Sequence, residues 1–160
     1  MASTAQLLLY VFIVVFSLVG FALAWYIRVK KRGPEPLVCP VGSHCDSVVR
    51  SEYAFFLGIP VELLGMGYYA ATALGYLLFT LVPETASVEA TFVLIALTTL
   101  AILFSLYLTA LQTLVLRQWC TWCLSSAGVS VLIFLASLAV SRFGFVELLA
   151  RNSYAIALVQ

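Results

Sequence analysis

Two pairs of cysteines carry the chemistry that this sequence can perform. Cys39 and Cys45 lie in the segment VCPVGSHCDS, and Cys120 and Cys123 form a C-x-x-C pair in RQWCTWCLSS. The second pair stands where a polar turn gives way to an apolar run, and residues three apart share one face of a helix. The N-terminus of a helix favours negative charge, which lowers the pKa of a thiol and raises its thiolate fraction. The position of this pair therefore suits thiol–disulfide exchange.

The rest of the chain is too apolar for a water-soluble protein. Of its 160 residues, 64% are hydrophobic and 9% are charged, which indicates an integral membrane protein. A helix needs roughly 20 apolar residues to cross the hydrocarbon layer. Four windows of about this length carry no charge: Leu7–Ile27, Leu63–Val82, Ala90–Leu116 and Leu124–Ser141.

These windows are continuous apolar runs without polar alternation, so they favour helices over a membrane β-barrel. We expect an all-α fold, an integral membrane four-helix bundle with a cysteine-bearing loop between its first two helices. The predicted boundaries of this single membrane domain, residues 1–160, are helices at about 7–27, 61–82, 88–116 and 120–141, the loop at 28–60 and a surface tail at 142–160.

Four crossings of the membrane decide which segments share a side. The loop at 28–60 and the turn before Cys120 both follow an odd number of crossings, so all four cysteines gather at one membrane face. Membrane packing does not require this arrangement, which makes it the first indication of function.

Three interpretations of the four cysteines remain open on the residues alone. They could form structural disulfides or serve as small buried side chains, or they could bind zinc with His44 as an alternate ligand. The third interpretation, which we favour, is a dithiol relay. In it the loop pair exchanges with an outside partner, and the helix pair passes electrons to an acceptor dissolved in lipid that meets Cys123.

The array CPVGSHCDSVVRSEYAFFLGIPVELLG, followed two helices later by WCTWC, resembles the vitamin K epoxide reductase family, particularly its prokaryotic stand-alone members. The resemblance implies a four-helix bundle around a quinone, which is menaquinone, ubiquinone or a similar molecule. It also implies an enzyme that either reduces vitamin K or its epoxide, or oxidises a thioredoxin-fold partner. The expected partners are thus a thioredoxin-fold redox protein, a lipid quinone and the membrane, with no nucleic acid.

The same resemblance assigns a role to each cysteine. Cys39 resembles the loop cysteine that the partner's thiol attacks, and Cys45 the one that shuttles to the helix pair. Cys120 resembles the cysteine that accepts from Cys45, and Cys123 the one that reduces the quinone. Ser51 aligns with a family serine near the cap of the active site.

Two positions depart from the animal enzymes, where a tyrosine and an asparagine help to hold the vitamin K head group. This chain has Ala127 in place of the tyrosine, and Val61 and Glu62 where the asparagine is expected. We therefore expect reduction of an ordinary respiratory quinone. Glu62 is interpreted either as a proton donor or hydrogen-bond partner of the quinone, or as a cap of its helix. Trp122 is interpreted either as an interfacial residue or as part of the active site.

The distribution of basic residues predicts the orientation of the active face. Six of the eight lie on the cysteine side and two on the other: Arg28, Lys30, Lys31, Arg32, Arg50 and Arg117, against Arg142 and Arg151. The positive-inside rule then places the active face in the cytoplasm of the cell, with an extracytoplasmic active face as the alternative. Because the cytoplasm of hyperthermophiles contains disulfide-rich proteins, a cytoplasmic active face predicts an inverted-topology member from a thermophilic host that oxidises cytoplasmic partners.

Overall fold

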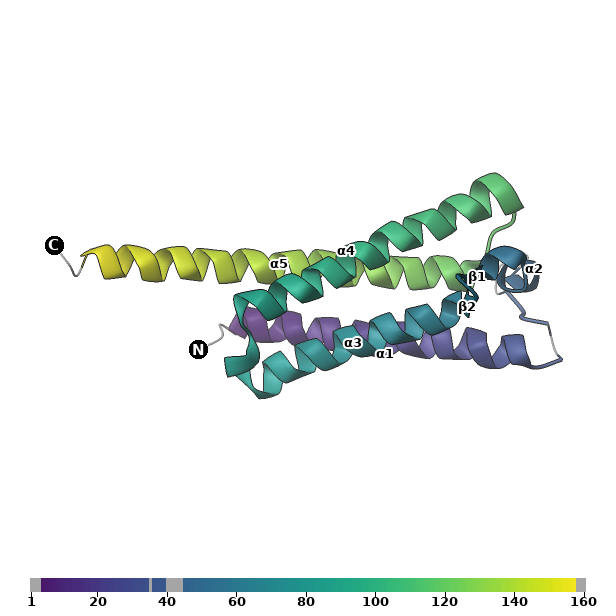
Figure 1. Cartoon of the computed structure of the whole chain (residues 1–160). Coiled ribbons are helices and arrows are strands. Elements are labelled where there is room, and N and C mark those ends of the chain that lie inside the picture. Colours follow the sequence, from purple (N-terminus) through teal and green to yellow (C-terminus); the bar gives the residue numbers. More distant parts are fainter. Residues whose placement is uncertain (1–3, 35, 40–44, 158–160) are drawn as a thin grey trace.

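Four long helices form the body of the protein (Figure 1). The computed structural model describes residues 4–34, 36–39 and 45–157, with side chains as far as Arg142. Among these residues, four helices are long and apolar enough to cross a membrane, and they are α1 (Thr4–Arg32), α3 (Val61–Leu81), α4 (Val88–Ala110) and α5 (Thr121–Ala157). The expected all-α membrane bundle is confirmed.

The first helix lies at the centre of the packing. α1 packs along α3 and α5, α4 packs mainly along α5, and α3 and α4 touch each other little. The main core holds Tyr10 and Ile13 of α1, Tyr69 and Tyr76 of α3, and Ile133 of α5. Few side chains of α4 are buried, and its exposed residues are mostly apolar, which suits a surface that faces lipid.

A glycine allows α1 and α3 to approach closely. A Cβ atom on Gly20 would overlap the ring of Tyr69, which is buried in the interface. The Tyr69 hydroxyl is fixed in turn, because it forms hydrogen bonds with Ser126 (2.8 Å) and Ser130 (3.0 Å) of α5. Tyr69 therefore joins three of the four helices.

Short elements between α1 and α3 cover one end of the bundle. They are α2 (Cys45–Val49), a 3₁₀ turn η1 (Glu52–Ala54) and a two-stranded hairpin of β1 (Phe55–Phe56) and β2 (Ile59–Pro60). Leu57 and Gly58 make the hairpin turn with positive φ angles of 52° and 80°, the combination found in type I′ turns. Leu57 is 88% exposed at the tip.

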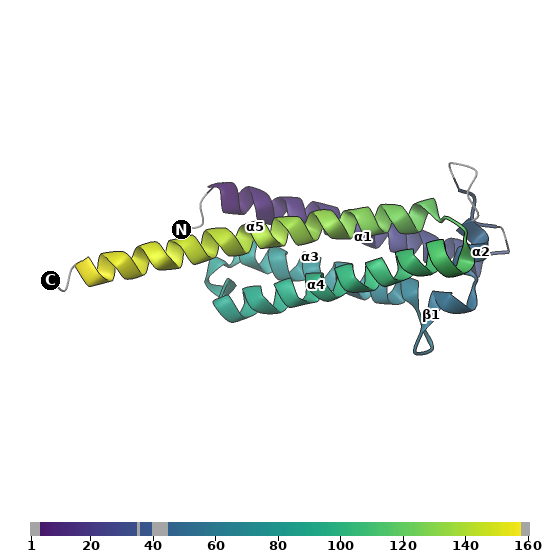
Figure 2. The ribbon, with the colours of Figure 1, turned by 90° about the horizontal axis from the view of Figure 1, so that it is seen from above.

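The other connections are tight. A 3₁₀ turn η2 (Pro83–Thr85) joins α3 to α4, whose first turn is capped by Ser87 accepting from the Ala90 amide at 3.1 Å. A π-helical segment η3 (Leu111–Leu116) extends α4, and Arg117 ends it in the left-handed conformation with φ 50°. This end lies beside the elements that cover the bundle (Figures 1 and 2).

Helix boundaries differ from the expectation at two places. α1 continues beyond residue 27 to Arg32, where Gly33 and Pro34 follow, and α5 continues through the expected surface tail to Ala157. The segment 142–157 contains no proline and a single glycine, so nothing in it ends a helix. At 1.5 Å per residue α5 is about 55 Å long, and it extends past the N-terminal end of α1 (Figure 2).

Candidate dithiol site

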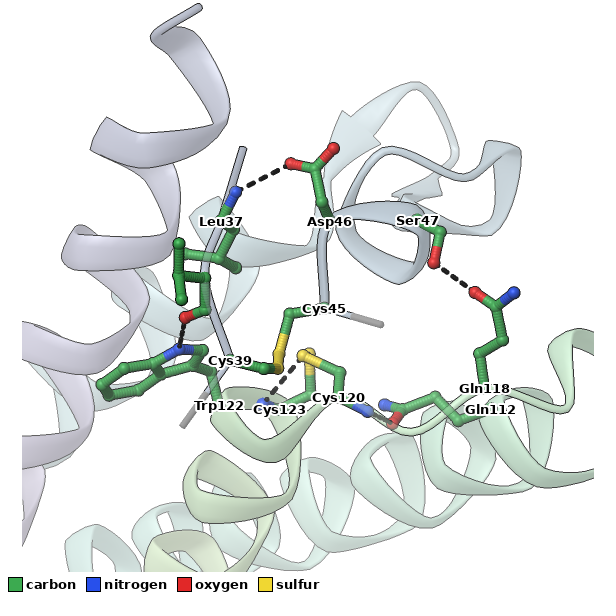
Figure 3. Close-up of a disulfide and its surroundings, with 11 residues drawn as sticks. Leu37, Cys39, Cys45, Asp46, Ser47, Gln112, Gln118, Cys120, Trp122 and Cys123 are labelled. Carbon is green, nitrogen blue, oxygen red and sulfur yellow. Dashed lines mark hydrogen bonds between the residues drawn. A yellow bond between two sulfur atoms is a disulfide. The ribbon is translucent and has the colours of Figure 1, made fainter. Parts of the chain in front are cut away.

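The loop cysteines are joined to each other. Cys39 and Cys45 form a disulfide with their Cα atoms 5.7 Å apart, and Figure 3 shows this bond beside the sulfur atoms of the second cysteine pair. Cys45 is the first residue of α2 and is 1% exposed, whereas Cys39 lies outside any helix or strand and is partly exposed. The loop disulfide thus has one outer and one inner sulfur.

An acidic residue next to Cys45 ties this loop together. The Asp46 carboxylate accepts hydrogen bonds from the Leu37 amide (3.0 Å) and from Nε of Arg50 (2.9 Å), and Arg50 also donates to the Gly33 carbonyl (3.2 Å). The Leu37 amide and then the Arg50 side chain hold the pKa of Asp46 below its usual value, with burial acting in the opposite direction. These contacts fix α2 against the end of α1.

Trp122 anchors the loop from the side of α5. Its indole N–H donates to the Val38 carbonyl at 3.2 Å, one residue before Cys39. Its ring packs on Tyr26 of α1, with 4.9 Å between ring centroids. Trp122 therefore connects the loop disulfide to two of the spanning helices.

The second pair lies at the start of α5. Cys120 caps this helix, because its carbonyl accepts from the Leu124 amide (3.0 Å) and its sulfur from the Cys123 amide (3.3 Å). The sulfur atoms of Cys120 and Cys123 are 2.6 Å apart, and both residues are free thiols. The Cys123 thiol and then the amides of Cys123 and Trp122 lower the pKa of Cys120 against the effect of its burial.

Gln112 is a residue of the site that the sequence did not reveal. It lies in η3, is 4% exposed, and accepts a hydrogen bond from the Cys120 amide at 3.2 Å through its side-chain oxygen. Nearby, Gln118 forms a hydrogen bond with Ser47 of α2. A lone amide side chain in the apolar run 90–116 was the available signal, since buried polar side chains in membranes have specific partners.

All four cysteines meet in one cluster. Cys45 and Cys120 are buried together with Ile27, Leu37, Val48 and Val49, and Cys39 and Cys123 pack against this group. The predicted gathering of the cysteines at one end of the bundle is therefore present. Cys45 and Cys120 are both almost completely buried, with exposed fractions of 1% and 0%, while Cys39 and Cys123 are partly exposed.

A cavity of about 190 Å³ opens beside Cys123, between α3, α4 and α5. Three more of the expected site residues line it, namely Ser51, Glu62 and Ala127. Trp122 is not among its lining residues and contacts the loop instead. Most of the remaining lining is aliphatic or aromatic, which suits an apolar ligand.

Glu62 in this cavity wall is held by two cations. It is 8% exposed, and its two carboxylate oxygens lie 3.2 Å from Arg28 Nη1 and 3.3 Å from Lys31 Nζ. Lys31 also lies over the ring of Phe55, 4.5 Å from its centroid. Glu62 thus links the first turn of α3 to the end of α1, a role that sequence analysis did not anticipate.

The described residues do not form the zinc site that was one interpretation of the four cysteines. His44, the proposed alternate ligand, lies outside the described residues. Within the described ranges, no three side chains of histidine, cysteine, aspartate or glutamate are arranged to hold a metal ion. Cys39 and Cys45 are bonded to each other and so offer no thiolates to a metal.

Comparison with known proteins identifies the family of the chain. No curated protein matches it. A family model, described as the vitamin K epoxide reductase family, matches residues 11–138, from the first spanning helix into the fourth and across both cysteine pairs. Because this match covers most of the sequence, the chain belongs to the vitamin K epoxide reductase family.

Proposed function

We propose that this protein oxidises a thioredoxin-fold partner, passes the electrons through its two cysteine pairs and reduces a lipid quinone, and so supports protein disulfide formation. Its family membership and four spanning helices make it a multi-pass membrane thiol oxidoreductase that acts with a quinone. The partner and the electron route are the parts that we add.

The observation that carries the proposal is the order of exposure along the four sulfurs. Cys39 is partly exposed in the loop, and Cys45 and Cys120 are buried in the same cluster. Cys123 borders the cavity. Thiol–disulfide exchange requires sulfur atoms that can reach one another. Electrons that pass from an outside partner to the cavity beside Cys123 need the four sulfur atoms in this order.

The first half of the proposed reaction is exchange between the partner and the loop. A partner thiolate attacks Cys39, the Cys39–Cys45 bond breaks, and Cys45 leaves as a thiolate. The partner's second thiol then releases Cys39, so the partner departs as a disulfide. Both loop cysteines are now thiols.

The second half transfers the electrons to the helix pair. The Cys45 thiolate attacks Cys120 of a Cys120–Cys123 disulfide and displaces Cys123. Cys39 then attacks Cys45, which restores the loop disulfide and leaves Cys120 and Cys123 as thiols. The pairing observed here, with the loop pair bonded and the helix pair free, corresponds to this stage.

The cavity suits a quinone as the final acceptor. Its walls are mainly apolar, Cys123 borders it, and it holds a buried tyrosine hydroxyl without a partner, on Tyr68. A bound quinone supplies an acceptor for two electrons and two protons. Cys120 and Cys123 give up both with their thiol hydrogens as they form a disulfide, so the cycle is balanced.

A cysteine-to-serine series tests the proposal. Cys39→Ser and Cys45→Ser should abolish quinone reduction by a reduced thioredoxin-fold protein but keep turnover with a small dithiol that reaches the helix pair directly. Cys120→Ser and Cys123→Ser should abolish both, because no dithiol remains beside the cavity. Quinone reduction is followed by ultraviolet absorbance in detergent or nanodiscs.

Two results would contradict the proposal. Full turnover with the protein substrate in the loop variants would show that the loop pair is bypassed. Stoichiometric zinc in the purified protein, combined with no quinone-dependent thiol oxidation, would instead favour the metal-site interpretation.

The orientation is a separate part of the proposal. We place the active face in the cytoplasm, because the positive-inside rule counts basic residues whether or not they are paired. The ion pairs of Arg28 and Lys31 with Glu62 therefore leave the count unchanged.

A further inference from the structure

Few buried polar atoms of this protein lack a partner. Among the described side chains, the buried oxygens without a hydrogen-bond partner belong to Ser17, Tyr68 and Tyr76. Of these three residues, Tyr68 alone lines the cavity beside Cys123. A buried hydroxyl without a partner is costly to maintain, which makes the Tyr68 hydroxyl a feature that needs a reason.

Two other polar side chains of the cavity wall are already engaged. Glu62 is paired with Arg28 and Lys31. The Tyr69 hydroxyl bonds to Ser126 and Ser130.

Of two further wall residues, one already has a hydrogen-bond partner and the other has no polar side-chain atom. The side-chain oxygen of Gln112 accepts from the Cys120 amide. Ala127 lines the wall with a methyl group that cannot donate a hydrogen bond. The Tyr68 hydroxyl is thus a buried donor on a residue of the wall that has no hydrogen-bond partner among the described residues.

Tyr68 and Cys123 both line this cavity. The Tyr68 ring packs on Tyr69, with 4.8 Å between centroids. Tyr69 is fixed by its 2.8 Å hydrogen bond to Ser126 of α5, one helical turn after Cys123. Contact with the fixed Tyr69 ring therefore restrains the Tyr68 ring in the wall of the cavity that Cys123 also lines.

We infer that the Tyr68 hydroxyl donates a hydrogen bond to a carbonyl oxygen of the quinone. The inference rests on the proposed function and adds a specificity-determining contact to the same site. A quinone oxygen accepts hydrogen bonds and does not donate them, so an O–H donor is the matching partner. As the helix cysteines release two electrons and two protons, negative charge develops on that oxygen, and a donor in an apolar site stabilises it.

Conservative variants isolate this contact. Tyr68→Phe removes only the hydroxyl, and Tyr76→Phe is the matched control, because it removes an equally unpartnered hydroxyl from the core of the same helix. With both cysteine pairs oxidised, binding of menadione, a naphthoquinone, is measured by calorimetry without turnover. Tyr68→Phe should weaken menadione binding about fivefold, the effect of one hydrogen bond, and Tyr76→Phe should leave it unchanged.

Two further readouts separate this contact from a general loss of structure. Binding of methylnaphthalene, which has the same rings without the carbonyl oxygens, should not respond to Tyr68→Phe. The melting temperature of the quinone-free protein should stay the same or rise, because the variant removes a buried group that lacks a partner. In turnover, the KM for quinone should rise about fivefold while the KM for the small dithiol stays constant.

The outcomes distinguish the inference from the proposed function. Equal menadione binding by wild type and Tyr68→Phe, or an equal loss in Tyr76→Phe, overturns the role of Tyr68 and leaves the electron route intact. Absence of menadione binding and of quinone-dependent turnover in the wild type overturns the proposed function, and the inference fails with it.

Discussion

The two thiols of the helix pair occupy different surroundings. Cys120 caps α5 and receives hydrogen bonds from the Cys123 amide and thiol, whereas Cys123 borders the apolar cavity. The largest cause of the lowered pKa of Cys120 is the hydrogen bond from Cys123. In the helix pair, Cys120 is therefore the sulfur suited to carry the negative charge.

The pKa of Cys120 should respond to removal of its donor. In protein with Cys39→Ser and Cys45→Ser, we expect the Cys120 thiolate to persist below the ordinary pKa of a thiol and to be lost as the pH falls through the lowered value. Adding Cys123→Ala removes the main cause of the shift and should raise the pKa. Thiolate absorbance against pH measures both, and an unchanged pKa would contradict the assigned cause.

A substitution of Trp122 tests whether this side chain holds the loop or contacts the quinone. Trp122→Phe keeps the aromatic ring beside Tyr26 but removes the hydrogen bond to the Val38 carbonyl. We expect the KM for the protein partner to rise about fivefold, the effect of one hydrogen bond, with the KM for quinone unchanged. The reverse pattern in steady-state kinetics would place Trp122 in the quinone site.

At the scale of elements, irregular segments position the site. The π-helical segment η3 brings Gln112 to the Cys120 amide, and π-helical turns often occur at functional sites. The left-handed Arg117 then redirects the chain so that α5 can start at Thr121. Regular spanning helices hold these segments at one end of the bundle.

The contact of α1 with α3 depends on Gly20. Gly20→Ala would drive a methyl group into the ring of Tyr69, which cannot move aside because Ser126 and Ser130 hold its hydroxyl. We expect a loss of about 1–3 kcal/mol in the free energy of unfolding, typical of overpacking. The measurement is the melting temperature in detergent.

Gly67→Ala is the matched control for this substitution. Gly67 lies on α3, and a Cβ atom there meets nothing within 4 Å. We expect no decrease in melting temperature for this variant. Equal losses in the two variants would show that the close approach at Gly20 is unimportant.

At the scale of the whole molecule, the helices pack unevenly. α1 packs along both α3 and α5, whereas α4 packs mainly along α5 and makes few contacts with α3. The cavity lies between these less closely packed helices, at the end where the loop covers the bundle. The start of α1 and the end of α5 lie at the end of the bundle opposite the cysteines (Figure 1).

The orientation predicts the outcome of a reporter fusion. A reporter that is active only outside the cytoplasm, fused after Gln160, should be active if the cysteine face is cytoplasmic. A reporter that works only in the cytoplasm should be silent at the same position and active when inserted after Gly58, at the tip of the hairpin. The opposite pattern would establish an extracytoplasmic active face.

Much of the fold followed from the sequence because membrane helices satisfy their own backbone hydrogen bonds. Charge-free runs of sufficient length therefore predicted the four spans, and the parity of crossings predicted one common end for the cysteines. The end of α5 was not predicted, because apolar residues interrupted by charges suit a surface segment and a continuing helix equally well. Glu62 was placed near the site, but its pairing with Arg28 and Lys31 depends on how α1 meets α3.

The sequence by itself determined the number of spans, the types and spacing of the reactive thiols and the family that they resemble. The tertiary structure decided which sulfurs are bonded, the burial of Cys45 and Cys120, and the cavity into which Cys123 opens. It also decided that Gln112 holds the Cys120 amide and that the Tyr68 hydroxyl has no partner. The physical reason is that spans are local properties of the chain, whereas burial and hydrogen-bond partners arise between residues far apart in sequence.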